Sequence, residues 1–401
     1  MSKHRTDAEN KVSALLVIAK ESLNLSVAFL SRLDGTTQHL EVVESSVPFL
    51  FKEGVKQRQD TTFCQAIIDK KLPSVIPDVR KFPEAMKLPA ARMPRIRSYV
   101  SVPVVLSDGS LYGTFCAAGL TTDKELTKRD KSLMDVLAHA AAVIIEPGVR
   151  EQTRQAEIKG RLGPILQTGG PAVVLQPIVE LATGRRVGAE ALSRFPAEWS
   201  KAPDVCFGEA HSVGDGDRLE LLALDRAAEY LDHVGGYIAM NVSPSTLLTP
   251  DCTALLSALR LGRVVLELSE HDPVDDYAAL HEVLKPLRAQ GMQLAIDDVG
   301  AGFSSLRHIV MTAPDVLKLD RSIVHGVHSD AVLRTLVRSL VDFAKGCEAR
   351  VVAEGVEAAE DAATLLALGV DYGQGWYFGR PGPADDLAPY VRDTSAVPAR
   401  V

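Results

Sequence analysis

The sequence predicts two folded units, a small α+β domain followed by an α/β domain built as an eight-stranded barrel. At 401 residues the chain is long enough for two domains, each with its own core. The pattern changes at Pro171, where helices and hairpin strands give way to short apolar runs that alternate with helical stretches. Eight such runs follow, and eight parallel-type strands are the number that closes a barrel.

The first third of the chain has the pattern of a helix, antiparallel strands and a closing helix. The hairpin turn Ser107-Asp108-Gly109-Ser110 between two apolar runs is a strong signal for paired strands. The predicted elements are an opening helix over 10–24, strands over 26–32 and 39–44, a helix over 62–69, strands over 98–105 and 111–118, and a last helix over 128–145. They form an α+β sandwich without a strong catalytic constellation.

Proline and glycine mark the join between the two domains. The dipeptide Pro147-Gly148 is predicted to end the closing helix. Charged residues at helical spacing over 149–159 predict a short connector helix, which Gly163-Pro164 and Gly169-Gly170-Pro171 end. We therefore expect a helical linker over residues 148–170.

Composition excludes some partners and compartments. A formal net charge of −8 without a basic block argues against binding to a nucleic-acid polymer. No run of about 18 residues is continuously apolar, so no secretory or membrane-spanning segment is expected. Five dispersed cysteines without CxxC spacing indicate reduced thiols and a cytoplasmic location. Cys64 is a candidate redox or cofactor residue, although burial statistics favour a structural cysteine.

The eight apolar runs after Pro171 share one feature, a polar residue at the end of each run. These residues are Gln176, Glu190, Asn241, Glu267, Asp297, Lys318, Glu354 and Gln374. A single one of them is a weak signal, because a solvated turn explains it equally well. In a closed barrel, however, the strand ends meet at one mouth. Carboxylates gathered there repel each other, so we expect cations at the mouth.

The run that ends in Asp297 and Asp298, just before a glycine-rich turn, indicates which cations these are. The candidate ligands at the mouth are oxygen donors without His or Cys, a set that favours Mg²⁺ or Mn²⁺ over Zn²⁺. Two adjacent acids can hold two ions, an arrangement that suits attack of water on a phosphate ester. Lys318 would then stabilise charge or orient the water, and Glu354 would bind the second ion.

Other interpretations of these residues stay open at this point. The glycines of Gly300-Ala301-Gly302 suit a dinucleotide loop, but the required strand, GxGxxG and helix context is missing. Asp315, Asp320 and Glu357 are explained about equally well as ordinary acids at strand or helix ends. A different barrel enzyme, such as an enolising lyase, would need a second base at the mouth.

The ordered motifs of the second domain, placed at residues 171–395, resemble those of EAL-domain cyclic di-GMP phosphodiesterases. They stand as Gln176-Pro-Ile, Glu190-Ala-Leu-Ser-Arg194, Asn241-Val-Ser, Glu267-Leu-Ser-Glu270, Asp297-Asp-Val-Gly-Ala-Gly-Phe-Ser-Ser-Leu306, Asp315-Val-Leu-Lys-Leu-Asp320, Ala353-Glu-Gly-Val-Glu357 and Gln374-Gly-Trp-Tyr-Phe. The resemblance implies a modified, TIM-like (β/α)8 barrel whose first strand is antiparallel to the others. It also implies hydrolysis of cyclic di-GMP to linear pGpG with two Mg²⁺ or Mn²⁺ ions.

The same resemblance implies a role for each matching residue. The metal ligands would be Glu190, Asn241, Glu267, Asp297, Asp298 and Glu354, and the catalytic residues Lys318, Glu354, Asp298 and Glu190. The substrate contacts would be Gln176, Arg194, Gln374 and Asp320, with Glu270 as the anchor of the loop after Asp298. The alternative is a catalytically silent cyclic di-GMP receptor, which the complete set of ligand positions disfavours.

The first domain, placed at residues 8–147, resembles a GAF domain. The likeness rests on Phe63-Cys64, Ile76-Pro77-Asp78, Ser98-Tyr-Val-Ser-Val-Pro103 and Leu111-Tyr-Gly-Thr-Phe-Cys116. It implies that a small-molecule effector binds this domain and regulates the enzyme. It also implies a homodimer.

Overall fold

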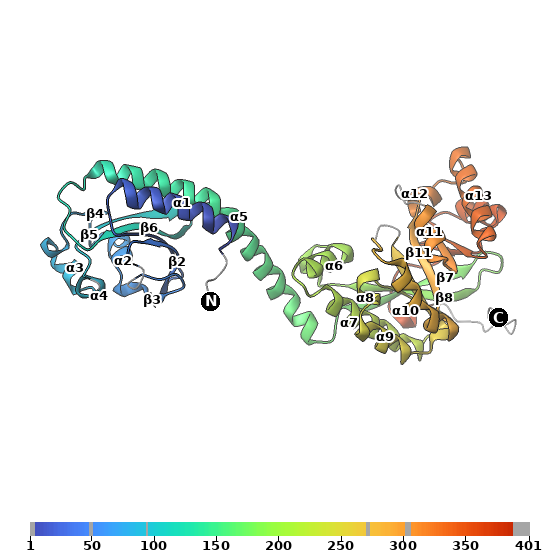
Figure 1. Cartoon of the computed structure of the whole chain (residues 1–401). Coiled ribbons are helices and arrows are strands. Elements are labelled where there is room, and N and C mark those ends of the chain that lie inside the picture. Colours follow the sequence, from blue (N-terminus) through green and yellow to red (C-terminus); the bar gives the residue numbers. More distant parts are fainter. Residues whose placement is uncertain (1–4, 48–50, 94, 270–272, 301–305, 388–401) are drawn as a thin grey trace. The chain divides into compact units, whose positions relative to one another are not determined.

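The computed structural model describes residues 5–47, 51–93, 95–269, 273–300 and 306–387. The chain divides into two compact units, residues 1–154 and residues 155–401 (Figure 1).

The first unit is built on an antiparallel sheet of six strands in the order β3-β2-β1-β6-β5-β4. The strands are β1 Val27–Leu33, β2 Thr37–Ser45, β3 Lys56–Arg58, β4 Val75–Ile76, β5 Ser98–Val105 and β6 Leu111–Gly119. Its four longest strands confirm the four that the sequence predicts, whereas the short β3 and β4 have too few residues to show an alternating pattern.

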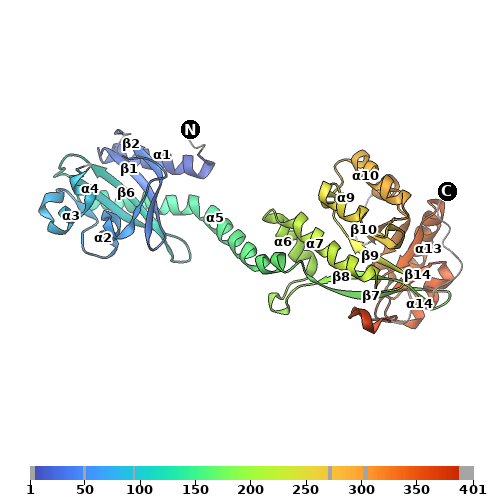
Figure 2. The ribbon, with the colours of Figure 1, turned by 90° about the horizontal axis from the view of Figure 1, so that it is seen from below.

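Helices cover both faces of this sheet (Figure 1, Figure 2). On one face α1, Asp7–Ser22, and the first part of α5, Lys128–Gln167, share a core with strand residues such as Leu30 and Val102. On the other face lie α2 Phe63–Ile68, α3 Pro83–Lys87 and α4 Pro89–Arg92. Cys64, Tyr99 and Cys116 belong to this second core.

The predicted breaks at Pro147-Gly148 and Gly163-Pro164 are wrong, because α5 is one continuous helix through both pairs. The connector predicted as a separate helix is part of α5. Pro147 removes one backbone N–H, which usually disrupts a helix. Here Ile145 and Val149 pack against the core on either side of it. In addition, Glu146 accepts a hydrogen bond from the backbone N–H of Ser107 and pairs with the Arg150 guanidinium at 2.6 Å. These contacts hold the turns before and after Pro147 in helical geometry.

Among the described residues α5 alone has the length and apolar composition of a helix that crosses a membrane. Its apolar side chains Met134, Leu137 and Ala141 are buried in the core of the first unit. A core helix passes the same test of length and composition, so this observation is weak evidence for a membrane span.

The second unit is a closed barrel of eight strands in the order β10-β11-β12-β13-β14-β7-β8-β9. The strands are β7 Ala172–Glu180, β8 Arg186–Arg194, β9 Tyr237–Asn241, β10 Val264–Ser269, β11 Gln293–Val299, β12 Val316–Leu319, β13 Arg350–Ala353 and β14 Tyr372–Gln374. β7 is antiparallel to both of its neighbours, β8 and β14, and the other pairs are parallel. The predicted barrel and its antiparallel first strand are confirmed.

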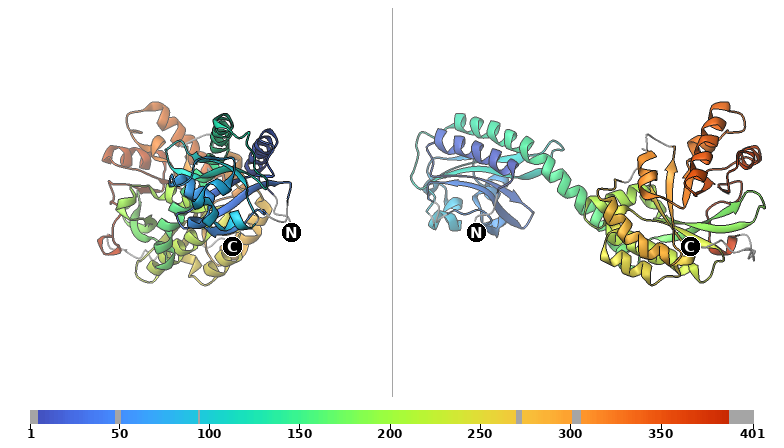
Figure 3. Two further views of the ribbon diagram at one scale, coloured as in Figure 1. Left: turned by 90° about the vertical axis from the view of Figure 1, so that its left-hand side faces the viewer. Right: turned by 45° about the vertical axis from the view of Figure 1, so that its right-hand side comes forward.

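The helices of this unit lie outside the barrel (Figure 3). They are α6 Pro203–Ser212, α7 Gly216–Ala228, α8 Pro244–Leu247, α9 Pro250–Ser257, α10 Tyr277–Ala289, α11 Leu306–Thr312, α12 Arg321–Val324, α13 Ala331–Gly346 and α14 Ala359–Leu368. Their buried side chains, such as Leu284 of α10, form one large core with the outward-facing residues Leu266 and Leu294 of the strands.

The interior of the barrel is filled by a separate layer of apolar side chains, formed by Ile178, Ala239, Val265, Ala295, Val316 and Val352. Because side chains alternate along a strand, the residue two positions away points to the same side. Two positions toward the mouth from these six residues lie Gln176, Asn241, Glu267, Asp297, Lys318 and Glu354. The barrel therefore places a polar layer immediately next to an apolar one.

Two of the predicted strand ends are wrong. Gln176 and Glu190 lie in the middle of β7 and β8, where they face each other across the antiparallel pair. This pairing continues to Ala172 and Arg194, beyond the point where the parallel strands end. The two strands lengthen because an antiparallel hairpin satisfies its own backbone groups without help from the rest of the barrel.

Candidate active site

Lys318 occupies the centre of the polar layer. Its side chain is 1% exposed. Its ammonium Nζ lies 2.9 Å from Glu267 Oε2, 3.0 Å from Asp297 Oδ2, 2.7 Å from Glu354 Oε1 and 3.5 Å from Glu190 Oε2. One buried cation therefore holds together acids from four other strands or strand ends.

Glu190 is oriented by two amide side chains, one of which is held in turn by a third. Asn241 Nδ2 donates to Glu190 Oε1 at 3.0 Å, and Gln374 Nε2 donates to Glu190 Oε2 at 2.5 Å. Gln374 Nε2 also donates to Gln176 Oε1 at 3.0 Å, and Gln176 Nε2 donates to the carbonyl of Gly379 at 3.1 Å. These bonds fix which end of each amide is the donor. Gln374 Oε1 is consequently left buried without a hydrogen-bond partner among the described residues.

Asp297 and Asp298 belong to one acidic group because β11 is irregular at this point. Neighbouring residues of a regular strand point to opposite faces. Between Ile296 and Val299 the pairing of β11 with β12 shifts register, and Asp298 has a left-handed φ of 60°. Such a bulge turns one side chain toward the other face. Asp is one of the few non-glycine residues that tolerate this conformation.

Burial and charge act in opposite directions in this cluster. Burial alone would lower the pKa of Lys318, but its four carboxylate neighbours raise that pKa well above the ordinary value. Burial raises the pKa of Glu267 and Glu354, and the Lys318 ammonium only partly opposes this effect. Burial likewise disfavours ionised Glu190, but Lys318 and the Gln374 amide outweigh it and lower the pKa. The acids compete for one positive charge.

The acids fit two divalent cations. The carboxylates of Glu190, Glu267 and Asp297 bring one oxygen each within 4.8 Å of one another, and those of Asp297, Asp298 and Glu354 do the same. Five ionised carboxylates around one ammonium leave four negative charges, which two divalent cations would neutralise. The donors are oxygens, the ligands that Mg²⁺ and Mn²⁺ prefer. The structure thus brings together the residues that the sequence analysis expects on two ions.

A cavity of about 300 Å³ opens beside these acids. Its lining includes Gln176, Glu190, Asp297, Glu354, Gln374 and four residues to which the sequence analysis gives no site role, Leu192, Arg321, Glu357 and Trp376. The Arg321 guanidinium lies 2.9 Å from the Glu357 carboxylate, and the Arg380 guanidinium lies 4.4 Å from the centre of the half-exposed Trp376 ring. A cation and an aromatic ring on one wall suit a ligand with phosphates and flat bases.

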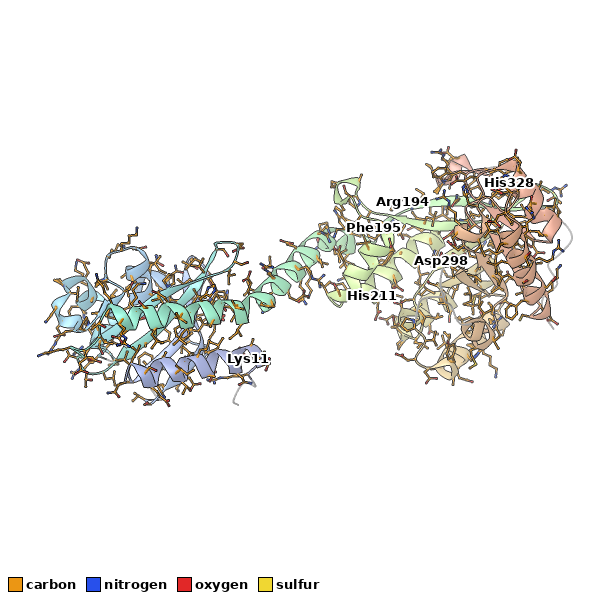
Figure 4. All side chains as sticks on the ribbon, turned by 90° about the horizontal axis from the view of Figure 1, so that it is seen from above. Lys11, Arg194, Phe195, His211, Asp298 and His328 are labelled. Atoms are coloured by element: carbon orange, nitrogen blue, oxygen red, sulfur yellow. The ribbon has the colours of Figure 1, made fainter. Side chains whose placement is uncertain are left out.

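Three predicted site residues lie elsewhere or outside the described residues. Arg194 is the last residue of β8 (Figure 4) and is absent from the described lining of this cavity. Its Nη1 donates to the carbonyl of Ser193 at 2.9 Å. Asp320 caps α12, because its Oδ1 accepts from the backbone N–H of Ser322 at 2.8 Å. Glu270, the predicted loop anchor, lies outside the described residues.

Glu220 is a buried acid that holds the chain next to the site, and the sequence pattern did not predict this role. This buried acid of α7 accepts hydrogen bonds from the backbone N–H and the hydroxyl of Ser243 at 2.9 and 2.8 Å. Its other oxygen lies 2.6 Å from Nε2 of His211 (Figure 4). Ser243 follows Asn241 by two residues, so Glu220 fixes the chain just after a predicted ligand. The sequence does contain a signal that Glu220 is buried, because Glu220, Leu224 and Ala227 recur at helical spacing on the buried face of α7.

We expect Glu220→Ala to reduce turnover of the full chain by about 10- to 100-fold, the usual cost of losing a group that orients a ligand. The Michaelis constant for substrate should change little, whereas the Mn²⁺ concentration needed for half-maximal rate should rise. Glu360→Ala, at an exposed glutamate of α14, is the matched control. An unchanged Mn²⁺ dependence in Glu220→Ala would show that Glu220 contributes only to folding.

The fold and the site together define a class, namely a barrel protein with an acidic mouth that fits divalent cations, beside a polar cavity. A family model described as the EAL domain matches residues 161–381, and one described as the GAF domain matches residues 7–145. The EAL match covers more than half of the chain, so this protein belongs to the EAL domain family, with a GAF domain in front.

Two similar proteins carry names that describe a function. The probable cyclic di-GMP phosphodiesterase PdeB of Escherichia coli strain K12 is 29% identical over 241 residues, which are 57% of this chain and 46% of that protein. The probable cyclic di-GMP phosphodiesterase PdeN of the same strain is 30% identical over 234 residues, 55% of this chain and 45% of that protein. This chain thus spans less than half the length of either relative.

One solved structure adds a ligand-bound example. It is described as the PaMucR phosphodiesterase in complex with c-di-GMP and is 27% identical to this chain, with a TM-score of 0.51. The match covers 58% of this chain and all of that one.

Proposed function

We propose that this protein hydrolyses cyclic di-GMP to linear pGpG in the cavity at the mouth of the barrel. The observation that carries the proposal is the pair of acidic groups joined through Asp297, with Lys318 between them. Relatives named as cyclic di-GMP phosphodiesterases and a c-di-GMP complex on the same fold support the choice of substrate.

Two divalent cations, Mg²⁺ or Mn²⁺, would polarise the phosphate ester and make water a better nucleophile when bound. Glu190, Asn241, Glu267 and Asp297 would hold one of them, and Asp298 and Glu354, with Asp297, the other. Lys318 would orient the attacking water and balance the charge that develops at phosphorus. Its ammonium reaches oxygens of both acidic groups, so it is well placed for this task.

The substrate itself would lie along the cavity wall. Gln374 Oε1, buried and without a partner among the described residues, is available to a donor on the ligand. Gln176 would assist it from the neighbouring strand. Arg321 would contact a phosphate and Trp376 would stack on a guanine base. Arg194 and Asp320 stay proposed substrate contacts on the strength of their motifs alone.

The remaining features of the proposal concern the whole chain. A small-molecule effector would bind the GAF domain and regulate hydrolysis, and the protein would act as a cytoplasmic homodimer. Light scattering on the purified full chain tests the dimer directly.

Turnover of cyclic di-GMP by the purified full chain with Mg²⁺ or Mn²⁺ tests the proposed activity, with linear pGpG identified by mass spectrometry. We expect Glu190→Gln to reduce the rate by about three orders of magnitude or more, because it removes a charged ligand and several kcal/mol of transition-state stabilisation. Glu198→Gln, at an exposed glutamate, should behave as wild type. Tight binding of cyclic di-GMP without cleavage would favour the alternative, a catalytically silent receptor.

A further inference from the structure

Two cysteines meet in the core of the first unit although 52 residues separate them in the sequence. Cys64 lies in the first turn of α2 and Cys116 lies in β6. Their sulfur atoms are 3.4 Å apart, and both residues are at most 1% exposed. Both are free thiols. A separation this small lets the sulfurs bond after a short movement of either side chain.

Polar groups surround these sulfurs in a core that is otherwise apolar. Gln38 Nε2 donates to Cys64 Sγ at 2.9 Å, and the Tyr99 hydroxyl lies 3.2 Å from the same sulfur. The hydroxyls of Ser101 and Thr114 each lie 3.2 Å from Cys116 Sγ. Burying four polar side chains is costly unless they have partners. Ordinary structural cysteines need no such surroundings.

The two sulfurs differ in their tendency to ionise. Burial opposes ionisation of Cys64, but hydrogen bonds from Cys116, Thr114, Tyr99 and Gln38 outweigh it and lower the pKa of this thiol. Burial raises the pKa of Cys116 well above its ordinary value. The hydrogen bonds that reach its sulfur therefore make Cys64 the more readily ionised thiol of the pair. Burial raises the pKa of Cys252 in the second unit. The lowered pKa of Cys64 is therefore not an effect of burial alone.

A chain of polar groups connects the sulfurs with the surface. Gln57 on the exposed strand β3 donates from Nε2 to Gln38 Oε1 at 2.8 Å, and Gln38 in turn donates to Cys64. Gln38 also donates to the Ser31 hydroxyl at 2.8 Å.

We propose that Cys64 and Cys116 form an oxidisable dithiol that a small peroxide converts to an intramolecular disulfide. The Cys64 thiolate attacks one oxygen of hydrogen peroxide, the O–O bond breaks, and the product is a sulfenic acid with release of hydroxide, which takes up a proton. The Cys116 sulfur then attacks the Cys64 sulfur, its proton leaves with the displaced hydroxyl as water, and the S–S bond forms. Two thiols and one peroxide give one disulfide and two waters.

Mass spectrometry of the reduced full chain treated with hydrogen peroxide tests this proposal without any need for phosphodiesterase activity. We expect the count of thiols that react with an alkylating agent under denaturing conditions to fall from five to three. Peptide mapping should identify a Cys64–Cys116 crosslink, formed about tenfold faster than oxidation of Cys252 because the thiolate is the reactive form. Thioredoxin-type or dithiothreitol reduction should restore five thiols.

Two variants separate the roles of the sulfurs. Cys116→Ser should leave a sulfenic acid on Cys64 that dimedone traps, whereas Cys64→Ser should abolish the rapid reaction. Cys252→Ser is the matched control and should form the crosslink as wild type does. If either variant fails to fold, the wild-type peptide map still tests whether the Cys64–Cys116 crosslink forms. Oxidation confined to the exposed Cys347, or a Cys64 no faster than Cys252, would overturn the proposal.

Discussion

A Lys318→Met variant is expected to lose most of the stability of the barrel in EDTA and all measurable turnover. Methionine matches the lysine side chain as far as Cε but lacks the ammonium, so it leaves four carboxylates without their common cation in a buried site. Removing one partner of a buried ionic group costs about 3–5 kcal/mol. Thermal unfolding of the full chain followed by circular dichroism measures this loss, and the transition that Mn²⁺ shifts in the wild type identifies the barrel.

Mn²⁺ should restore much of the lost stability but none of the activity. Divalent cations would neutralise the same acids and bind only the folded state, so they stabilise it by mass action. Lys285→Met, at an exposed lysine of α10, provides the control for loss of a positive charge. Equal stability of Lys318→Met and wild type in EDTA would show that the acids are protonated and need no ammonium.

Asp297→Asn and Asp298→Asn should differ in the number of metal ions that they remove. Asp297 belongs to both acidic groups, whereas Asp298 belongs to one. Titration with Mn²⁺ followed by calorimetry should therefore give two ions per chain for the wild type, one for Asp298→Asn and weak binding at both positions for Asp297→Asn. Turnover should fall by about three orders of magnitude or more in Asp297→Asn, since both ions would support the proposed hydrolysis.

Asn keeps the shape of each aspartate, and it tolerates the left-handed backbone at position 298, so both variants should fold. Asp315→Asn is the control, because it makes the same aspartate-to-asparagine change in the same unit. Asp315 bonds to Arg288 at 2.8 Å and is absent from the described lining of the cavity. Retention of two ions by Asp297→Asn would refute the shared role of Asp297.

The polar layer of the barrel is predictable because strands have a period of two. Residues such as Val265 and Val316 are followed two positions later by Glu267 and Lys318, so the sequence places an apolar and a polar layer on the same inward face. Barrel closure then brings residues that are far apart in the chain to one mouth. The period of two along each strand and the closure of the barrel together predict most residues of the candidate site.

The parts that escaped prediction depend on contacts between distant residues. Pro147 remains helical because Glu146 and Val149 on either side have partners in the sheet domain. Glu220 has its role only because α7 packs where β9 ends. The Cys64–Cys116 contact joins α2 to β6, although the two cysteines are 52 residues apart in the sequence. Local propensity carries no information on such pairs.

The left-handed backbone of Asp298 restricts which substitutions this chain can accept there. Glycine, asparagine and aspartate accommodate a φ of 60°, whereas glutamate, the other acid, would be strained. A mutation to asparagine would thus keep the fold while removing a charge from one metal group. Under the proposed function, a descendant that binds cyclic di-GMP without cleaving it is therefore a single codon change away. The reverse change at the same residue would restore the missing carboxylate.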